Sequence, residues 1–214
     1  LINFNKEFSQ LTADNFVNKI LLEKMRVCWL LIGDDFRFGA KRMGDSFFLK
    51  KISREKGFTF ETMPSLEYAG VRISSTLVRN LLNDGKLEQV KNYLGRNYSI
   101  SGRVEKGDRY GRQIGFPTAN IDIKDYVLGR PGVYAIRVKI PTRDNYVNGI
   151  ANLGYRPTFN GKKILLEVHL FNFSGNLYNK YLTVEFKKFI RKEKKFKNVD
   201  QLRRQIKIDL MKAK

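Results

Sequence analysis

The residues best suited to chemistry lie between Gly107 and Asn120. Glycines and arginines recur through the first part of this segment, at Gly107, Arg109, Gly111, Arg112 and Gly115. Glycine lets backbone N–H groups approach phosphate oxygens because no Cβ stands in the way, and the arginines add positive charge. Thr118 and Asn120 follow with neutral oxygen atoms suited to hydrated Mg²⁺. The segment therefore predicts a loop that binds phosphates and Mg²⁺, with an unliganded surface loop as the alternative.

A second candidate is Glu167, in a segment whose side chains alternate between two faces as in a β-strand. Glu167 shares its face with Leu165, His169 and Phe171. A carboxylate among apolar neighbours calls for a reason, although the strand pattern alone favours a surface glutamate that faces water. His169 is the only histidine, which excludes a histidine-based triad and a multi-histidine metal site, and we interpret it as structural.

A third candidate is the start of an amphipathic helix at Ser74, Ser75 and Thr76, which carries Arg79 one turn later. The free N–H groups and the dipole at the start of a helix favour anions. From these residues alone, an N-cap without a ligand is the simpler interpretation.

The patterns of secondary structure divide the chain near Arg96. Before this residue, amphipathic helices alternate with short apolar strands at 27–32 and 58–63, which indicates part of a doubly wound parallel sheet. After it, short strands of period two indicate a barrel or sandwich, at 100–105, 132–140, 146–153, 164–173 and 182–190. Residues 199–211 predict a closing helix.

The composition indicates a folded protein without a membrane-spanning helix. Of 214 residues, 42% are hydrophobic, which is enough to fill a core and excludes a disordered chain. No apolar run approaches the ~20 residues of a membrane span. The single cysteine, Cys28, lies in an apolar run that predicts a buried thiol, and no charged and apolar leader opens the chain. We therefore expect a protein of the reducing cytoplasm.

The formal charge is +20, and most of it arises in residues 96–214, which hold 26 basic and 10 acidic residues. Lys187–Lys197 contains seven basic residues, a pattern typical of a solvated face, a phosphate-attracting surface or a nucleic-acid patch. The alternative function is therefore a basic β-barrel that binds nucleic acid with the aromatic residues Tyr98, Phe171, Phe173 and Tyr178. That alternative gives no role to Thr118, Asn120 and Glu167.

Several segments resemble riboflavin kinases in order and spacing: GRQIGFPTANI at 111–121, GVYA at 132–135, NLGYRPT at 152–158 and LLEVHLFNF at 165–173. Upstream, GDDFRFG at 33–39 and RISSTLVR at 72–79 resemble the adenylyltransferase half of bacterial bifunctional riboflavin kinases/FMN adenylyltransferases, the FAD synthetases. The resemblance implies an α/β, Rossmann-like nucleotidyltransferase domain at 1–95 that is incomplete at its N-terminus. It implies an all-β riboflavin kinase domain at 96–214, a six-stranded barrel with a C-terminal helix.

The resemblance also assigns roles in the kinase half. Glu167 would be the catalytic base for the ribityl 5′-hydroxyl of riboflavin, while Thr118 and Asn120 would hold the Mg²⁺ that accompanies ATP. The glycine-rich segment would surround the ATP phosphates with Gly107, Gly111, Arg112 and Gly115. Arg191 and Glu193, in the segment FIRKEKKF, would lie at the flavin.

In the adenylyltransferase half, the resemblance assigns Ser74, Ser75, Thr76 and Arg79 to ATP. Asp35 and Phe36 would lie on the FMN side. The family also has an N-terminal His-x-Gly-His segment for the nucleotide phosphates, and this sequence, with its one histidine at position 169, does not contain it. The start at Leu1 favours truncation as the explanation.

The expected function is flavin cofactor biosynthesis. We expect the chain to phosphorylate riboflavin to FMN and to form little or no FAD, whereas the intact protein would adenylylate FMN to FAD. ATP, riboflavin and FMN are the expected partners, without a membrane or nucleic acid, and the sequence does not define an oligomeric state.

Overall fold

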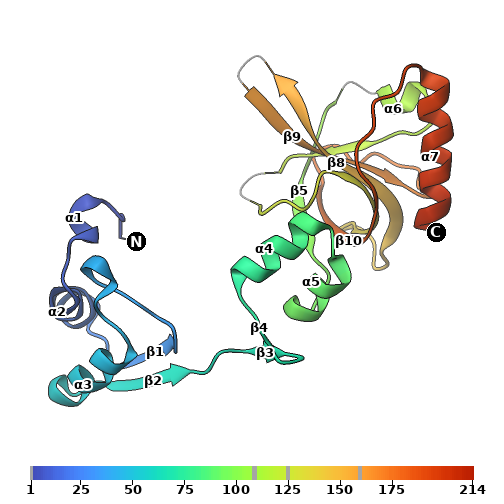
Figure 1. The fold of residues 1–214 in the computed structure, drawn as a ribbon. Helices are drawn as coiled ribbons and strands as arrows, with labels where there is room; N and C mark the ends of the chain where they lie inside the picture. Colours follow the sequence, from blue (N-terminus) through green and yellow to red (C-terminus); the bar gives the residue numbers. More distant parts are fainter. Residues whose placement is uncertain (1, 108–109, 124–125, 159–160) are drawn as a thin grey trace. The chain divides into compact units, whose positions relative to one another are not determined.

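The chain folds into two units, Leu1–Arg72 and Ile73–Lys214 (Figure 1). The computed structural model describes residues 2–107, 110–123, 126–158 and 161–214. Within these ranges, no helix combines the length and the apolar character needed to cross a membrane.

The first unit contains short helices and small sheets. Its elements are α1 (Lys6–Ser9), α2 (Ala13–Asn15), η1 (Phe16–Lys24), β1 (Trp29–Gly33), η2 (Ala40–Arg42), α3 (Ser46–Lys56), β2 (Thr59–Met63), β3 (Glu67–Tyr68) and β4 (Val71–Arg72). The carboxylate of Asp45 accepts the Phe48 N–H at 2.8 Å and so begins α3, and Gly57 ends it in the left-handed conformation. β1 and β2 pair in parallel, as the alternating pattern predicts.

The core of this unit covers only one face of β1. Leu30 and Ile32 pack against the core cluster, whereas Trp29 and Leu31 are exposed. Cys28 precedes the strand and is exposed, so the prediction of a buried thiol is wrong. The apolar run of residues 27–32 does not distinguish a strand buried on both faces from one that is covered on a single face.

The second unit is built on a closed barrel of six strands in the order β10-β5-β6-β9-β8-β7, which confirms the predicted six-stranded architecture (Figure 1). The strands are β5 (Ser99–Glu105), β6 (Ala119–Ile121), β7 (Gly132–Lys139), β8 (Val147–Thr158), β9 (Gly161–Leu170) and β10 (Tyr181–Arg191). All described pairings of the barrel are antiparallel. Alternation buries Leu166 and Val168 of β9 in the barrel core, and therefore turns Glu167 to the opposite face.

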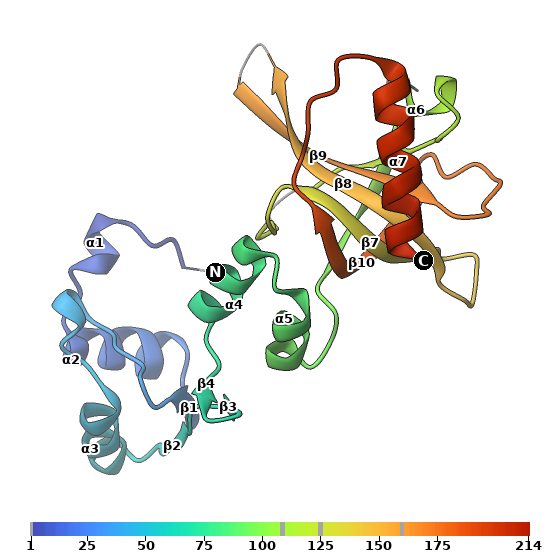
Figure 2. The same ribbon diagram turned by 45° about the vertical axis from the view of Figure 1, so that its right-hand side comes forward.

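Helices cover parts of this barrel. They are α4 (Ser75–Asp84), α5 (Leu87–Leu94), α6 (Tyr110–Gln113) and the C-terminal α7 (Val199–Ala213), which lies against β7, β8 and β10 (Figure 2). Leu81 and Leu82 of α4 and Leu87 and Val90 of α5 belong to the same buried cluster as the barrel strands. The two helices that follow the first unit in sequence therefore share the core of the barrel.

Candidate active site

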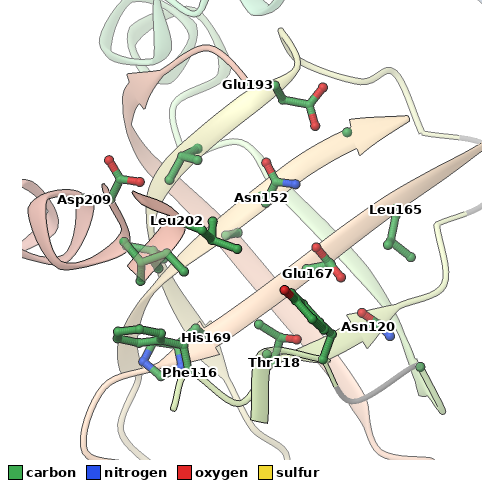
Figure 3. Close-up of a pocket in the computed structure, with 18 of the residues that line it drawn as sticks. Phe116, Thr118, Asn120, Asn152, Leu165, Glu167, His169, Glu193, Leu202 and Asp209 are labelled. Carbon is green, nitrogen blue, oxygen red and sulfur yellow. The ribbon is translucent and has the colours of Figure 1, made fainter. Parts of the chain in front are cut away.

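A cavity of about 580 Å³ lies on the outer face of the barrel, where β6, β8 and β9 adjoin one another (Figure 3). One part of its wall is apolar and comes from strands and α7: Val133, Ile150, Leu202 and Ile206. Another part is polar: Thr118, Asn120, Asn152 and Glu167. In Figure 3, Leu202 lies on the α7 side, and Glu167 and Asn120 lie together on the other side. The cavity can therefore hold a molecule with an apolar part and a hydroxylated part.

Glu167 stands between two asparagines in the polar wall. In the β6–β9 register it is opposite Asn120, and in the β8–β9 register it is opposite Asn152. Directly opposed side chains on a sheet have Cβ atoms about 4.5–5.5 Å apart, so the three polar groups form one row across three strands. A carboxylate with amide neighbours can accept the proton of a hydroxyl while the amides orient the substrate.

The glycine-rich segment brings its polar residues to this row. Gly107 lies so close to Asn120 that a Cβ on the glycine would be 1.5 Å from Asn120 Nδ2. Gly111 packs against the backbone just before Thr118, because a Cβ on this glycine would be 2.5 Å from the Phe116 carbonyl oxygen and 3.1 Å from Thr118 Oγ1. These contacts explain why glycine occupies both positions, since a Cβ would collide with the Asn120 side chain at Gly107 and with the Phe116 backbone at Gly111.

Asn120 and Thr118 fit the Mg²⁺ that the sequence predicts. Asn120 Oδ1 is buried and has no hydrogen-bond partner in the described part of the chain, so a lone pair is left for a ligand. Among the described residues, no cluster of three or more His, Cys, Asp and Glu side chains could hold a metal ion. Neutral oxygens suit an Mg²⁺ that arrives with the negative charge of a nucleotide.

A second cavity adjoins the first at Thr118 and Tyr178, which line both. Its volume is about 570 Å³, and Arg112, Pro117 and Phe173 contribute to its wall. Two cavities that meet beside the Thr118–Asn120–Glu167 group would allow two substrates to place their reacting ends together.

Arg191 and Glu193 also line the first cavity. The guanidinium of Arg191 is held by the carboxylate of Asp209 on α7, with its Nη2 2.8 Å from Oδ2. Glu193 lies over β8, where a Cβ on Gly154 would be 2.1 Å from its Oε1. The end of β10 therefore fixes α7 through Arg191, and the segment after β10 brings the carboxylate of Glu193 to the cavity.

Comparison with known proteins identifies the family of this chain. A family model described as riboflavin kinase matches residues 94–214, and one described as FAD synthetase matches residues 1–77. The bifunctional riboflavin kinase/FMN adenylyltransferase of Escherichia coli K12 is 42% identical over 213 residues, which are 100% of this chain and 68% of the relative. The chain belongs to the bifunctional riboflavin kinase/FMN adenylyltransferase family.

A second relative has the same family description, and one solved structure has a similar fold. The bifunctional riboflavin kinase/FMN adenylyltransferase of Haemophilus influenzae is 44% identical over 99% of this chain and 68% of its own length. A crystal structure described as a macrolide-efflux protein from Streptococcus pneumoniae has a TM-score of 0.81 and 30% identity, and the match covers 99% of this chain and 67% of that one.

The remaining candidate residues of this bifunctional family member lie in several places. Arg112 lines the second cavity. Gly115 lines neither cavity and has a φ of 87°, a left-handed conformation that favours glycine at the turn after α6. Arg109 lies outside the described residues.

The residues assigned to the adenylyltransferase are divided between the two units. In the first unit, Asp35 pairs with Arg72 at 2.6 Å, and the ring of Phe36 stacks on Phe38. The Ser65 hydroxyl donates to the neighbouring Asp34 and lowers the pKa of that carboxyl.

In the second unit, Ser74 Oγ accepts the Leu77 N–H at 3.1 Å and caps α4. Ser75 and Thr76 form the first turn of this helix, and Arg79 is exposed one turn later. The N-cap expected from the residues is therefore present, and it leaves the first-turn N–H groups at an exposed helix start.

Three residues that line the first cavity can be identified only in part from the sequence. Asn152 belongs to a motif of the family, but its position opposite Glu167 follows from the β8–β9 register. For His169 the sequence predicts only a structural role, yet it lines the cavity and its Nδ1 lies 2.8 Å from the Pro117 carbonyl. For Asp209 the only signal in the sequence is its position on the buried side of the amphipathic helix α7. A polar residue at such a position implies a hydrogen-bond partner.

Proposed function

We propose that this chain transfers the γ-phosphoryl group of ATP to the 5′-hydroxyl of riboflavin and produces FMN. The observation that carries the proposal is the row of Asn120, Glu167 and Asn152 in the wall of a cavity whose other part is apolar. Family membership supports the same reaction. It leaves no support for the alternative of a nucleic-acid-binding barrel.

In this proposal the flavin lies in the first cavity with its ring near α7 and its ribityl chain toward Glu167. The isoalloxazine ring would lie against Val133, Ile150 and the α7 residues Leu202 and Ile206, because its faces are apolar. The ribityl chain would then extend along the polar wall toward Glu167. Glu193, at the edge of the cavity, is an acceptor for a polar edge of the ring, and Arg191 supports α7 behind it.

Glu167 acts as the base in this proposal. Its carboxylate takes the proton of the 5′-hydroxyl, the hydroxyl oxygen forms the new bond to the γ-phosphorus, and the bond from that phosphorus to the β–γ bridging oxygen breaks so that ADP leaves. A positioned base contributes about 10²- to 10⁴-fold to the rate. Most of the remaining acceleration comes from orientation of the two substrates and from charge stabilisation.

ATP would occupy the second cavity and the glycine-rich segment. The nucleoside would lie in the second cavity, and the phosphates would pass Arg112 and Thr118 toward the row that holds Glu167. Gly107 and Gly111 allow this approach, since a Cβ would collide with Asn120 at the first position and with the Phe116 carbonyl oxygen at the second. Mg²⁺, held by Thr118 and Asn120 when ATP is bound, would neutralise phosphate charge.

We assign the second reaction of the family, adenylyl transfer from ATP to FMN, to residues 1–95, and the kinase reaction to residues 96–214. Ser74, Ser75, Thr76 and Arg79 would bind ATP at the exposed start of α4, and Asp35 and Phe36 would lie at FMN. The cytoplasm is the compartment that we propose, because one cysteine cannot form an internal disulfide and a reducing compartment needs none.

The test incubates the purified chain with riboflavin, ATP and Mg²⁺ and separates riboflavin, FMN and FAD by chromatography. Wild-type protein should form FMN, and Glu167→Gln should reduce its rate by about 10²- to 10⁴-fold while riboflavin binding is retained. Absence of FMN with the wild-type chain would refute the kinase proposal. FAD formation would support the second assignment and would contradict the expectation drawn from the missing histidine motif.

A further inference from the structure

The only histidine of the chain forms a contact that neither the reaction nor the family comparison assigns. His169 lies on β9 two residues after Glu167, and its Nδ1 is 2.8 Å from the carbonyl oxygen of Pro117. A carbonyl only accepts hydrogen bonds, so Nδ1 carries the proton and donates it. The hydrogen bond ties the strand of the base to the segment that precedes Thr118.

Pro117 lies two residues before the first described pair of β6 and β9. β6 pairs with β9 from Ala119 to Ile121, with Ala119 opposite Val168. Proline has no N–H, so the ladder cannot continue through Pro117 in the usual way. The Pro117 carbonyl lies outside the described β6–β9 pairing, and it accepts the hydrogen bond of the His169 imidazole at the place where the glycine-rich segment becomes a strand.

The ring of His169 also fixes the residue before the proline. Phe116 packs edge-on against the imidazole with ring centroids 5.9 Å apart, and the Phe116 N–H donates to the Gly111 carbonyl at 2.8 Å. Because a peptide unit is planar, holding the Pro117 carbonyl sets the plane from which Thr118 starts. The orientation of Thr118, and of Asn120 two residues later, therefore depends on His169.

We propose that His169 is a positioning residue: its Nδ1–H holds the Pro117 carbonyl and thereby aligns Thr118 and Asn120 for the Mg²⁺ that binds with ATP. The inference rests on the proposed function for the identity of the nucleotide and the metal ion. Groups that orient metal ligands typically change metal affinity by 10- to 100-fold when they are removed. We therefore expect the effect of His169 in the Mg²⁺-dependent part of ATP binding.

Two substitutions distinguish the hydrogen bond from the bulk of the ring. In His169→Asn the amide nitrogen can occupy the place of Nδ1, whereas in His169→Gln it lies one bond further out, near the place of Nε2. His169→Ala removes both the donor and the ring. Ser101→Ala serves as the control, since it deletes a 2.8 Å side-chain hydrogen bond to Thr183 between two strands of the same barrel, β5 and β10.

The measurement is the affinity for ATP by calorimetry, with Mg²⁺ and with EDTA, in the absence of riboflavin. His169→Ala and His169→Gln should weaken binding of ATP with Mg²⁺ about 10-fold and leave binding in EDTA unchanged. His169→Asn and Ser101→Ala should stay within about twofold of the wild type. The affinity for riboflavin should be unchanged in Ser101→Ala, which lies outside both cavities.

Other results would overturn the inference. They are an Mg²⁺ dependence in His169→Ala equal to that of the wild type, a defect in His169→Asn as large as in His169→Ala, and an equal loss of ATP affinity with Mg²⁺ and with EDTA. Absence of any Mg²⁺ dependence in the wild type would overturn it as well. If the wild type shows the expected His169-dependent ATP binding but forms no FMN, the kinase proposal fails and the positioning role stands.

Discussion

The carboxylate of Asp209 receives the Nε–H and an Nη2–H of Arg191, at distances of 2.8 to 3.0 Å. Gln205, one turn earlier on α7, donates to the same carboxylate at 2.9 Å. Asp209 is 1% exposed, so this pair is a buried attachment between the end of β10 and the C-terminal helix. It holds the helix that contributes Leu202 and Ile206 to the apolar wall of the first cavity.

Removal of this attachment should loosen both the fold and the cavity. Asp209→Ala leaves the charge of Arg191 without its partner, and breaking a buried ion pair in this way costs about 3–5 kcal/mol. Urea unfolding should show this loss, and riboflavin affinity should fall because Leu202 and Ile206 are no longer held. Asp200→Ala, at an exposed site in the first turn of the same helix, should change stability by less than about 1 kcal/mol. Equal effects of the two substitutions would contradict this role of Asp209.

The close approach of Gly107 to Asn120 predicts a coupled pair of substitutions. Gly107→Ala would place a Cβ on the amide nitrogen of Asn120 and should displace that side chain, as Asn120→Ala deletes it. Each single variant should lower the rate of FMN formation at limiting Mg²⁺. The double variant should be no worse than Asn120→Ala alone, since the collision no longer exists. Additive effects in the double-mutant cycle would show that Gly107 acts by some other route.

Glu185 should make the barrel sensitive to acid. Burial raises the pKa of this carboxyl, but hydrogen bonds from Tyr146, Arg137 and Asn97 lower it, and the net pKa lies below its ordinary value of 4.5. A carboxyl whose folded pKa is depressed stabilises the fold above its unfolded pKa, and this stabilisation is lost as the pH falls through the folded value.

The measurement compares the free energy of unfolding at about pH 7 and about pH 3. Glu185→Gln should be less stable than the wild type at the higher pH and should lose less stability on acidification. Glu88→Gln changes an exposed glutamate of α5 and should follow the wild type at both values. A parallel loss in wild type and Glu185→Gln would refute the assignment.

The packing of α4 on the barrel predicts a stability effect at a residue that lines neither cavity. Leu82 is 2% exposed and lies in the core cluster of the barrel, and its carbonyl accepts the Arg130 N–H. Leu82→Ala should cost about 2–5 kcal/mol and lower the unfolding midpoint of the barrel itself. The exposed neighbour Asn83→Ala is the control. A barrel transition unaffected by Leu82→Ala would mean that the helix unfolds independently.

The sequence predicts the strands of the barrel well because each has an alternating pattern long enough to recognise. β6 is the exception: its three residues, Ala119–Ile121, are embedded in the glycine-rich segment, whose composition predicts a loop. Motif residues such as Glu167 can be identified from local sequence. The partners of Glu167 cannot, because the register that places Asn152 beside it depends on pairing between distant segments.

The register of β9 protects the chemistry as well as the fold. Side chains alternate along a strand, so a slip of one residue would place Leu166 or Val168 in the cavity and would drive the carboxylate of Glu167 into the barrel interior. Leu166 and Val168 are 0% and 1% exposed, and their burial opposes such a slip. The apolar core therefore also fixes which face of β9 carries Glu167, the proposed base. Substitutions that loosen this core should therefore displace Glu167 and lower the rate of FMN formation before they change the overall secondary structure.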